Sequence, residues 1–186
     1  MMGEQHKKHS RREHLNDFHL NVAGEYVYDG ALYACQSDDA KQHRIKRAVW
    51  GMAAILIVAV IAGGYIPAPG MQNCFYVLLP YLGEFLGAAS VIWALAKLGM
   101  DWSAVREYNY QKSVAVLPVR TTVTAVFSLL GIVCELIFFF VNDHAGQTFF
   151  TLLYVLLKLT ALLSALVLRA EIMQAEWDKL PKKDNF

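Results

Sequence analysis

The sequence lacks the short motifs that would identify a common soluble catalytic site. It contains no Walker loop for nucleotide phosphates, no GxSxG or HExxH motif for hydrolysis, and no GxGxxG loop for a dinucleotide. Charged residues are also scarce, at 18% of the chain against about a quarter in a typical soluble domain. We therefore expect no soluble catalytic domain, no cofactor and no nucleic-acid partner.

Cysteine is sparse, and neither cysteine nor histidine is arranged for redox or metal chemistry. None of the three cysteines, Cys35, Cys74 and Cys134, belongs to a CxxC pair, which disfavours a membrane thiol oxidoreductase. The histidines near the start of the chain fit no established zinc framework; they are His6, His9, His14 and His19. We expect no metal site.

What the sequence does contain is long apolar runs. Hydrophobic residues make up 56% of the 186 residues, and they cluster in four blocks at about 48–66, 74–96, 119–141 and 148–168. Each block is long enough to cross a hydrocarbon core of roughly 30 Å, which takes about 20 helical residues. Lipid offers no partner for an unpaired backbone amide, so helix is the expected state. The sequence predicts an all-α integral membrane protein with four transmembrane helices in two hairpins, and no removable signal peptide.

The placement of basic residues predicts the orientation of these helices. Of the 17 Lys and Arg residues, 16 precede the first span, lie around the connection between the second and third spans, or follow the last span. The other two connections, PAPGMQN and NDHAGQ, contain none. Because basic residues stay on the cytoplasmic side, we expect both termini and the middle connection to be cytoplasmic, in a plasma membrane.

The remaining basic residue, Lys158, lies in the middle of the fourth span, and two glutamates share the apolar blocks with it. Glu84 and Lys158 both fall about 11 residues from the outer ends of their helices, or roughly 16 Å deep. Glu135 lies about 7 residues, or roughly 10 Å, below the outer end of the third span. Charges within a span usually face the bundle interior and pair with one another. We therefore predict an ion pair between Glu84 and Lys158, with Glu135 within reach of the same lysine.

Three interpretations of this intramembrane charged cluster stay open. The first is a structural ion pair that fixes helix register, the second a proton or substrate path, and the third a contact with another subunit. Two carboxylates against one ammonium leave an unbalanced site, so one glutamate is expected to hold a proton near neutral pH.

An internal duplication would explain several correspondences along the chain. A shift of 74 residues places Phe75, Leu78 and Ser90 on Phe149, Leu152 and Ser164, and it places Glu84 on Lys158. Two parallel hairpins would give such a pattern. Chance similarity between leucine-rich helices is the alternative.

Small residues and one proline accompany the charges. Gly83 and Gly87 flank Glu84, and such spacings let helix backbones approach closely in lipid. A second set follows Lys158 by one or two turns: Ala161, Ser164 and Ala165. Pro80, one turn before Glu84, predicts a kink in the second span.

The parts outside the membrane are predicted to be small cytoplasmic attachments. Residues 1–20 form a flexible basic tail. Residues 21–47 contain a β-hairpin-like segment, with Asp29-Gly30 as its turn, and a helix that runs into the first span. In the middle connection, Trp102 is expected at the membrane interface. The last helix is expected to continue to Leu180, so that residues 169–186 are a cytoplasmic helical tail.

Three classes of function are compatible with this sequence. The first is a non-catalytic membrane subunit or accessory protein, whose partners would be the lipid bilayer and a larger membrane protein or further copies of the chain. The second is a small proton-coupled transporter or channel that uses Glu84, Glu135 and Lys158. The third is a membrane enzyme, for which the outer face offers only Asp143 and His144.

Overall fold

The computed structural model of the protein describes residues 18–20, 24, 26–28, 30–142 and 148–181. The expected basic tail therefore lies almost entirely outside the described residues, as do Asp143, His144 and the last part of the C-terminal tail.

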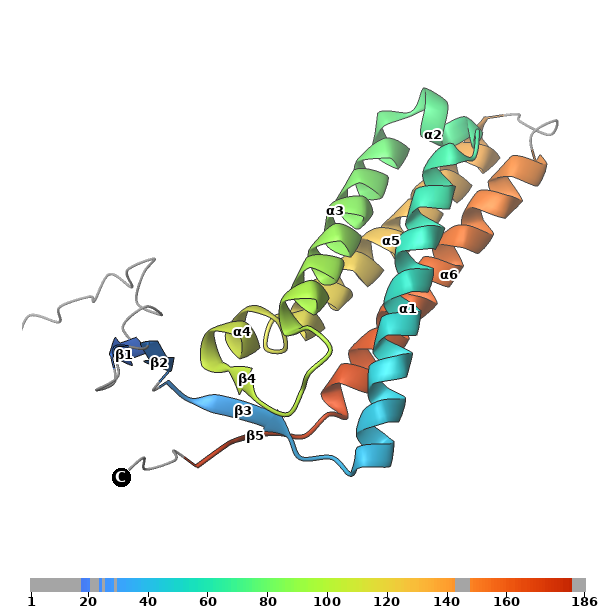
Figure 1. The fold of residues 1–186 in the computed structure, drawn as a ribbon. Helices are drawn as coiled ribbons and strands as arrows, with labels where there is room; N and C mark the ends of the chain where they lie inside the picture. The colour runs from blue at the N-terminus through green and yellow to red at the C-terminus, as the bar shows by residue number, and fades with distance from the viewer. Residues whose placement is uncertain (1–17, 21–23, 25, 29, 143–147, 182–186) are drawn as a thin grey trace, which may run out of the picture.

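Four long helices form the body of the molecule (Figure 1). They are α1 (Asp39–Tyr65), α3 (Phe75–Leu98), α5 (Leu117–Val141) and α6 (Thr148–Met173). Among the described residues, these four are long and apolar enough to cross a membrane. Their outer faces expose large apolar side chains such as Val58, Leu86, Phe140 and Leu152. This surface supports the prediction of a multi-pass membrane protein, since water would disfavour so much exposed hydrocarbon.

α1 begins well before the apolar run. Its N-cap residue is Asp38, and the helix continues without a break from Asp39 through the first predicted span to Tyr65. One helix therefore contains both the polar segment from Asp39 and the apolar run that follows it. Two short helices lie in the connections: α2 (Pro69–Asn73) follows α1, and α4 (Glu107–Lys112) precedes α5.

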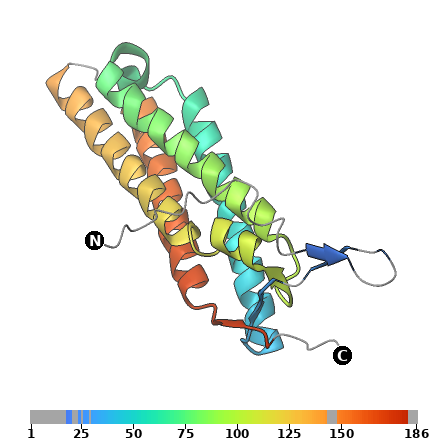
Figure 2. The same ribbon diagram turned by 90° about the vertical axis from the view of Figure 1, so that its left-hand side faces the viewer.

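The long helices run side by side along a common axis (Figures 1 and 2). α6 packs extensively against both α1 and α5, and α3 packs extensively against α5. The contact between α1 and α3, which are consecutive long helices, is much smaller. The apolar core between the helices is made by fully buried side chains that include Val49, Leu56, Val91, Leu95 and Leu168.

A small antiparallel sheet closes the end of the bundle at which α1 begins and α6 ends (Figure 1). Its central strand is β3 (Leu32–Cys35), with β4 (Val105–Arg106) on one side and β5 (Trp177–Lys179) on the other. Leu32 lies opposite Arg106, and Cys35 lies opposite Trp177. The sheet thus joins the segment before α1, the middle connection and the segment after α6.

The turn prediction at Asp29-Gly30 is wrong, because the strands on its two sides do not pair with each other. β2 (Tyr26–Tyr28) pairs instead with β1 (Phe18–Leu20), and β3 pairs with β4 and β5. Asp29 itself lies outside the described residues. Ring stacking offers a physical reason for the longer-range pairing: the rings of Tyr33 in β3 and Tyr110 in α4 are 4.2 Å apart and nearly parallel.

The prediction of a continuous last helix is also wrong. α6 ends at Met173, and Trp177 begins the edge strand β5 rather than a further helical turn. The Trp177 ring lies 5.5 Å from the ring of Trp102 and 5.7 Å from that of Tyr110. This aromatic packing draws the segment onto the sheet.

Trp102, which the sequence predicts to lie at the membrane interface, is buried within the protein. Only 1% of it is exposed, and its Nε1 donates a hydrogen bond of 3.3 Å to the Gly99 carbonyl. The ammonium of Lys46 lies 5.4 Å from its ring. Trp102 is therefore part of the core under the sheet.

Candidate functional site

Glu84 lies on the face of α3 that packs against α5, and its side chain is fully buried. Ser128 of α5 donates a hydrogen bond of 2.6 Å from Oγ to Glu84 Oε1. A carboxylate taken out of water loses its hydration, so a buried one needs such donors from the protein. Ser128 supplies one donor, and the other carboxylate oxygen accepts from a cation.

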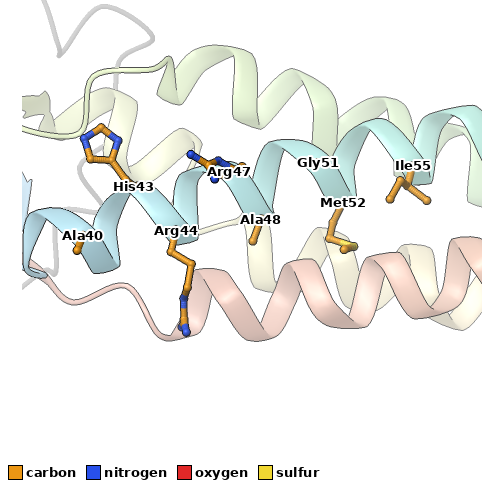
Figure 3. A pocket seen from close by; sticks show the side chains of 8 residues that line it. All are labelled: Ala40, His43, Arg44, Arg47, Ala48, Gly51, Met52 and Ile55. Carbon is orange, nitrogen blue, oxygen red and sulfur yellow. The ribbon is translucent and has the colours of Figure 1, made fainter.

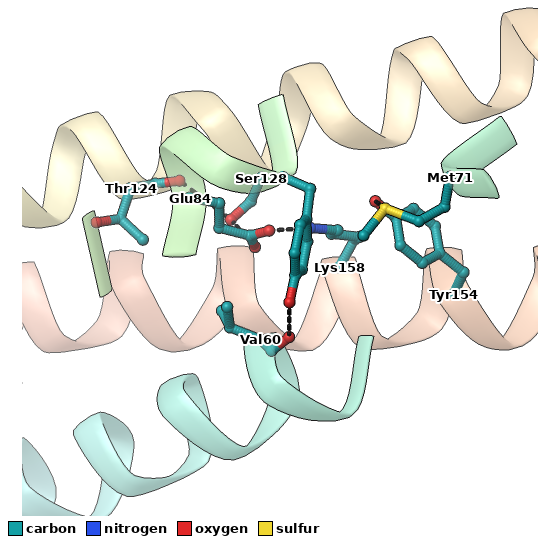
Figure 4. A network of polar contacts seen from close by, with 8 residues as sticks. Val60, Met71, Glu84, Thr124, Ser128, Tyr154 and Lys158 are labelled. Carbon is teal, nitrogen blue, oxygen red and sulfur yellow. Dashed lines mark hydrogen bonds and ion pairs between the residues drawn. The ribbon is translucent and has the colours of Figure 1, made fainter. Parts of the chain in front are cut away.

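That cation is Lys158 of α6, whose Nζ forms a salt bridge with Glu84 Oε2 (Figure 4). Lys158 is 2% exposed. Its Nζ also lies 4.5 Å from the ring centroid of Tyr81 and 5.1 Å from that of Tyr154. The negative faces of aromatic rings attract cations, most strongly where water is excluded. The ammonium is thus stabilised by one carboxylate and two rings.

Gly131 of α5 lies beside the lysine side chain. A Cβ atom at this position would lie 3.6 Å from Lys158 Cε and 3.8 Å from its Nζ. These are ordinary contact distances, so the lysine passes directly along the surface of α5 at Gly131.

The two tyrosines link this ion pair to the first part of the chain. The Tyr81 hydroxyl donates to the Val60 carbonyl of α1 at 3.4 Å, and the Tyr154 hydroxyl lies 3.9 Å from Met71 Sδ of α2. Figure 4 shows that Val60, Met71 and the charged pair come from separate helices. All four long helices and α2 therefore contribute to one polar network inside the bundle.

Glu135 of α5 is also fully buried, and it lies in a second polar group nearer α2. Its Oε1 accepts from the Gly70 backbone N–H and from Thr151 Oγ1, each at 3.4 Å. A Cβ atom at Gly70 would collide with Glu135 Oε2. The backbone of α2 can approach this carboxylate so closely only because residue 70 is a glycine.

A row of side chains on α6 connects the two groups. Thr151, Tyr154 and Lys158 are spaced by three and four residues, so they lie on one helix face, and all three are buried. Thr151 contacts Glu135, Tyr154 lies against the Lys158 ammonium, and Lys158 binds Glu84. The structure thus places Glu84 and Lys158 in direct contact and places Glu135 farther along the same polar row.

The small residues identified in the sequence lie at helix contacts within the chain. A Cβ atom at Gly83 would come within 2.6 Å of the Phe127 ring, and one at Gly87 would come within 2.6 Å of Thr124 Oγ1. Both glycines therefore allow α5 to pack closely against α3. The other three are buried on α6: Ala161, Ser164 and Ala165. Pro80 is buried inside α3, which the structure shows as a single helix through this position.

Several members of the network carry no charge, and the sequence analysis missed them. Tyr81 precedes Glu84 by three residues, and Tyr154 precedes Lys158 by four. Thr121, Thr124 and Ser128 likewise form a hydroxyl row along one face of α5. The helical spacing of these uncharged residues from the buried charges is the sequence pattern that could have identified them. No sequence pattern indicated Gly70, because its contact with Glu135 depends on how the connection between α1 and α3 folds.

The network contains polar groups suited to holding helices together and to holding protons. The described residues include no group of three His, Cys, Asp or Glu side chains that could bind a metal ion. Cys35, Cys74 and Cys134 are free thiols.

Comparisons with family models, with curated proteins and with solved structures found no match to the chain.

Proposed function

We propose that the protein is a non-catalytic subunit or accessory protein of a membrane assembly, and that its buried ion pair fixes the packing of its own helices. The observation that carries this proposal is the enclosure of the charges. Glu84 and Glu135 have no exposed surface, and Lys158 has 2%. A substrate would need access to these groups, whereas Glu84 and Lys158 already neutralise each other. Such an enclosed pair suits a structural role better than a binding role.

The ion pair would act by fixing helix register. Moving α3 by one turn relative to α6 displaces Glu84 by about 5.4 Å along the axis. Lys158 would then lose its carboxylate while still buried, which typically costs about 3–5 kcal/mol. Only one axial alignment of these two helices satisfies both charges.

The proposal includes the orientation predicted from the sequence, with the four long helices in a plasma membrane and both termini cytoplasmic. The sheet end of the bundle would then face the cytoplasm, together with the basic residues near it, among them Lys46, Arg106 and Lys179. The polar group around Glu135 would lie toward the outer face.

We also retain the two-hairpin duplication as part of the proposal. In the proposed duplication, α1 corresponds to α5 and α3 corresponds to α6. The contact of α1 with α6 then corresponds to that of α5 with α3, and both contacts are extensive. The corresponding contacts of α1 with α3 and of α5 with α6 differ greatly in extent. The first comparison supports the duplication, and the second counts against it.

The test of the subunit proposal is purification of the full chain in mild detergent through a terminal tag. We expect a larger membrane protein to co-elute in a fixed molar ratio on size-exclusion chromatography. An unrelated four-span protein with the same tag is the control. Recovery of the chain alone, together with ion or proton flux when the pure chain is placed in liposomes, would contradict the proposal.

A second candidate is a small proton-coupled transporter or channel, and the polar row between Glu135 and Glu84 favours it. Thr151, Tyr154 and Lys158 lie in a row on α6 between the two buried carboxylates, with Thr151 bonded to Glu135 and Lys158 to Glu84. The discriminating variant is Glu135→Gln, because the amide oxygen can still accept from Gly70 and Thr151. In a transporter this variant abolishes proton-linked flux in liposomes, whereas in a structural subunit it leaves partner binding unchanged.

A further inference from the structure

A groove runs along one face of α1, at the end of the helix where the apolar run begins (Figure 3). Eight residues line it: Ala40, His43, Arg44, Arg47, Ala48, Gly51, Met52 and Ile55. Successive members are one or three residues apart, so together they form a single stripe on the helix surface. After Ala40, the basic members come first along the chain, and the apolar members follow.

The floor of the groove is open at Gly51. A Cβ atom built there would meet no heavy atom within 4 Å, so no neighbouring helix covers this position. Ala48, one turn earlier, is also small. The apolar half of the groove therefore has a shallow floor of small residues, with the longer Met52 and Ile55 side chains beside it (Figure 3).

The other half of the groove is positively charged. Figure 3 shows Arg44 and Arg47 extending to opposite sides of the helix. Arg44 reaches toward the segment after α6, where its Nη2 lies 3.5 Å from Gln174 Oε1. None of the eight lining residues is acidic, and the carboxylate of Glu176 is engaged by Lys41 at 3.2 Å. The charged side chains of the lining are therefore all basic.

The change from basic to apolar lining coincides with the predicted membrane boundary at about residue 48. Arg47 and Ile55 are separated by eight residues, or about 12 Å along the helix. The basic half therefore lies at the level of the lipid headgroups, and the apolar half reaches into the hydrocarbon. A ligand that fits both halves needs a negative headgroup and a hydrocarbon chain.

We propose that this groove binds an anionic phospholipid, with its headgroup at the level of Arg44 and Arg47 and one acyl chain over Gly51 and Met52. Guanidinium groups match phosphate oxygens in geometry as well as in charge. Basic residues beside a membrane span attract anionic lipid with about 1 kcal/mol each. The acyl chain would cover the open floor at Gly51.

The test uses the purified full chain in detergent, with lipid binding measured by native mass spectrometry. Phosphatidylglycerol and phosphatidylcholine with identical acyl chains are compared. We expect phosphatidylglycerol to bind more tightly. The changes Arg44→Gln and Arg47→Gln should each weaken its binding about fivefold, the factor that corresponds to about 1 kcal/mol. Lys112→Gln, which removes an exposed basic residue of α4, is the matched control and should have no effect.

A second variant tests the apolar half separately. Gly51→Leu should fill the floor of the groove, and its Cβ has open space around it, since nothing lies within 4 Å of that atom. It also replaces glycine with a better helix former. We expect the thermal stability to be kept or raised while phosphatidylglycerol binding is lost.

Four outcomes would overturn the proposal. The first is equal binding of the two lipids, and the second is phosphatidylglycerol binding that survives both the arginine changes and Gly51→Leu. The third is equally tight binding of glycerol phosphate, which has no acyl chain and would show that the arginines recognise free phosphate. If Gly51→Leu dissociates a dimer that has no lipid preference, the groove is occupied by a second copy of the chain and the proposal is likewise wrong.

Discussion

The ammonium of Lys158 and the carboxylate of Glu84 form a salt bridge between α6 and α3, although 74 residues separate them in the chain. Ser128 binds the same carboxylate from α5, and the rings of Tyr81 and Tyr154 lie against the ammonium. Glu84 therefore depends on groups from two other helices, and Lys158 depends on groups from α3 and from its own helix.

The ion pair predicts strong coupling between the two charges. Glu84→Leu or Lys158→Met alone leaves one buried charge without its partner, and each should lower the free energy of unfolding by about 3–5 kcal/mol. The double variant should lose less than the sum of the single losses. Thermal or denaturant unfolding in detergent, analysed as a double-mutant cycle, measures this coupling. Strictly additive losses would mean that the two charges do not interact.

Ser128→Ala tests the hydrogen bond to the carboxylate. The change leaves Glu84 Oε1 without the Ser128 donor, and an unsatisfied buried polar atom costs about 1–3 kcal/mol. We expect a loss of stability in this range. Thr122→Ala is the control, because Thr122 is exposed on the same helix and bonds only to the Pro118 carbonyl. Equal effects of the two changes would assign the loss to helix propensity instead of the hydrogen bond.

Glycine at position 87 is predicted to be required for the contact between α3 and α5. In Gly87→Ala the new Cβ would lie 2.6 Å from Thr124 Oγ1 and 3.3 Å from Thr124 Cα, so the helices must separate. We expect a loss of about 1–3 kcal/mol, the usual cost of overpacking. Gly51→Ala meets no neighbour and should stabilise α1 by up to about 1 kcal/mol. Stabilisation by both changes would show that α3 and α5 are not packed this closely.

The proposed orientation is tested with reporter fusions. A fusion after Gly70 and one after Gly146 should report the outer side of the membrane, because the connections around them contain no Lys or Arg. A fusion after Lys112 should report the cytoplasm. A cytoplasmic signal from either of the first two fusions would contradict the four-span orientation.

The sequence was most informative where a residue type conflicted with its surroundings. Four apolar runs were enough to predict four long helices, because few other structures satisfy the backbone in lipid. Lys158 and Glu84 stood out because a charge is rare in such a run, and equal depth indicated that they could meet. Their uncharged neighbours, such as Ser128 and Tyr154, are common in spans and stood out only after the partners were known.

The sheet was not predictable from local sequence. Leu32 pairs with Arg106, and Cys35 pairs with Trp177. The strands of the sheet therefore come from distant parts of the chain, which the helix bundle brings together. Strands of two to four residues carry no useful alternation of polar and apolar side chains. The segment 169–180 had a helical pattern, and tertiary contacts of Trp177 overrode it from residue 174 onward.

The order of the strands in this sheet sets a sequence of events during synthesis. β3 is made before any of the long helices, β4 when two of them are complete, and β5 after all four. The central strand therefore waits for its last partner until all four long helices have been made. A chain whose final helices fail to insert correctly cannot bring Trp177 beside Cys35, and it is left with an open strand edge that quality-control proteases and chaperones can recognise.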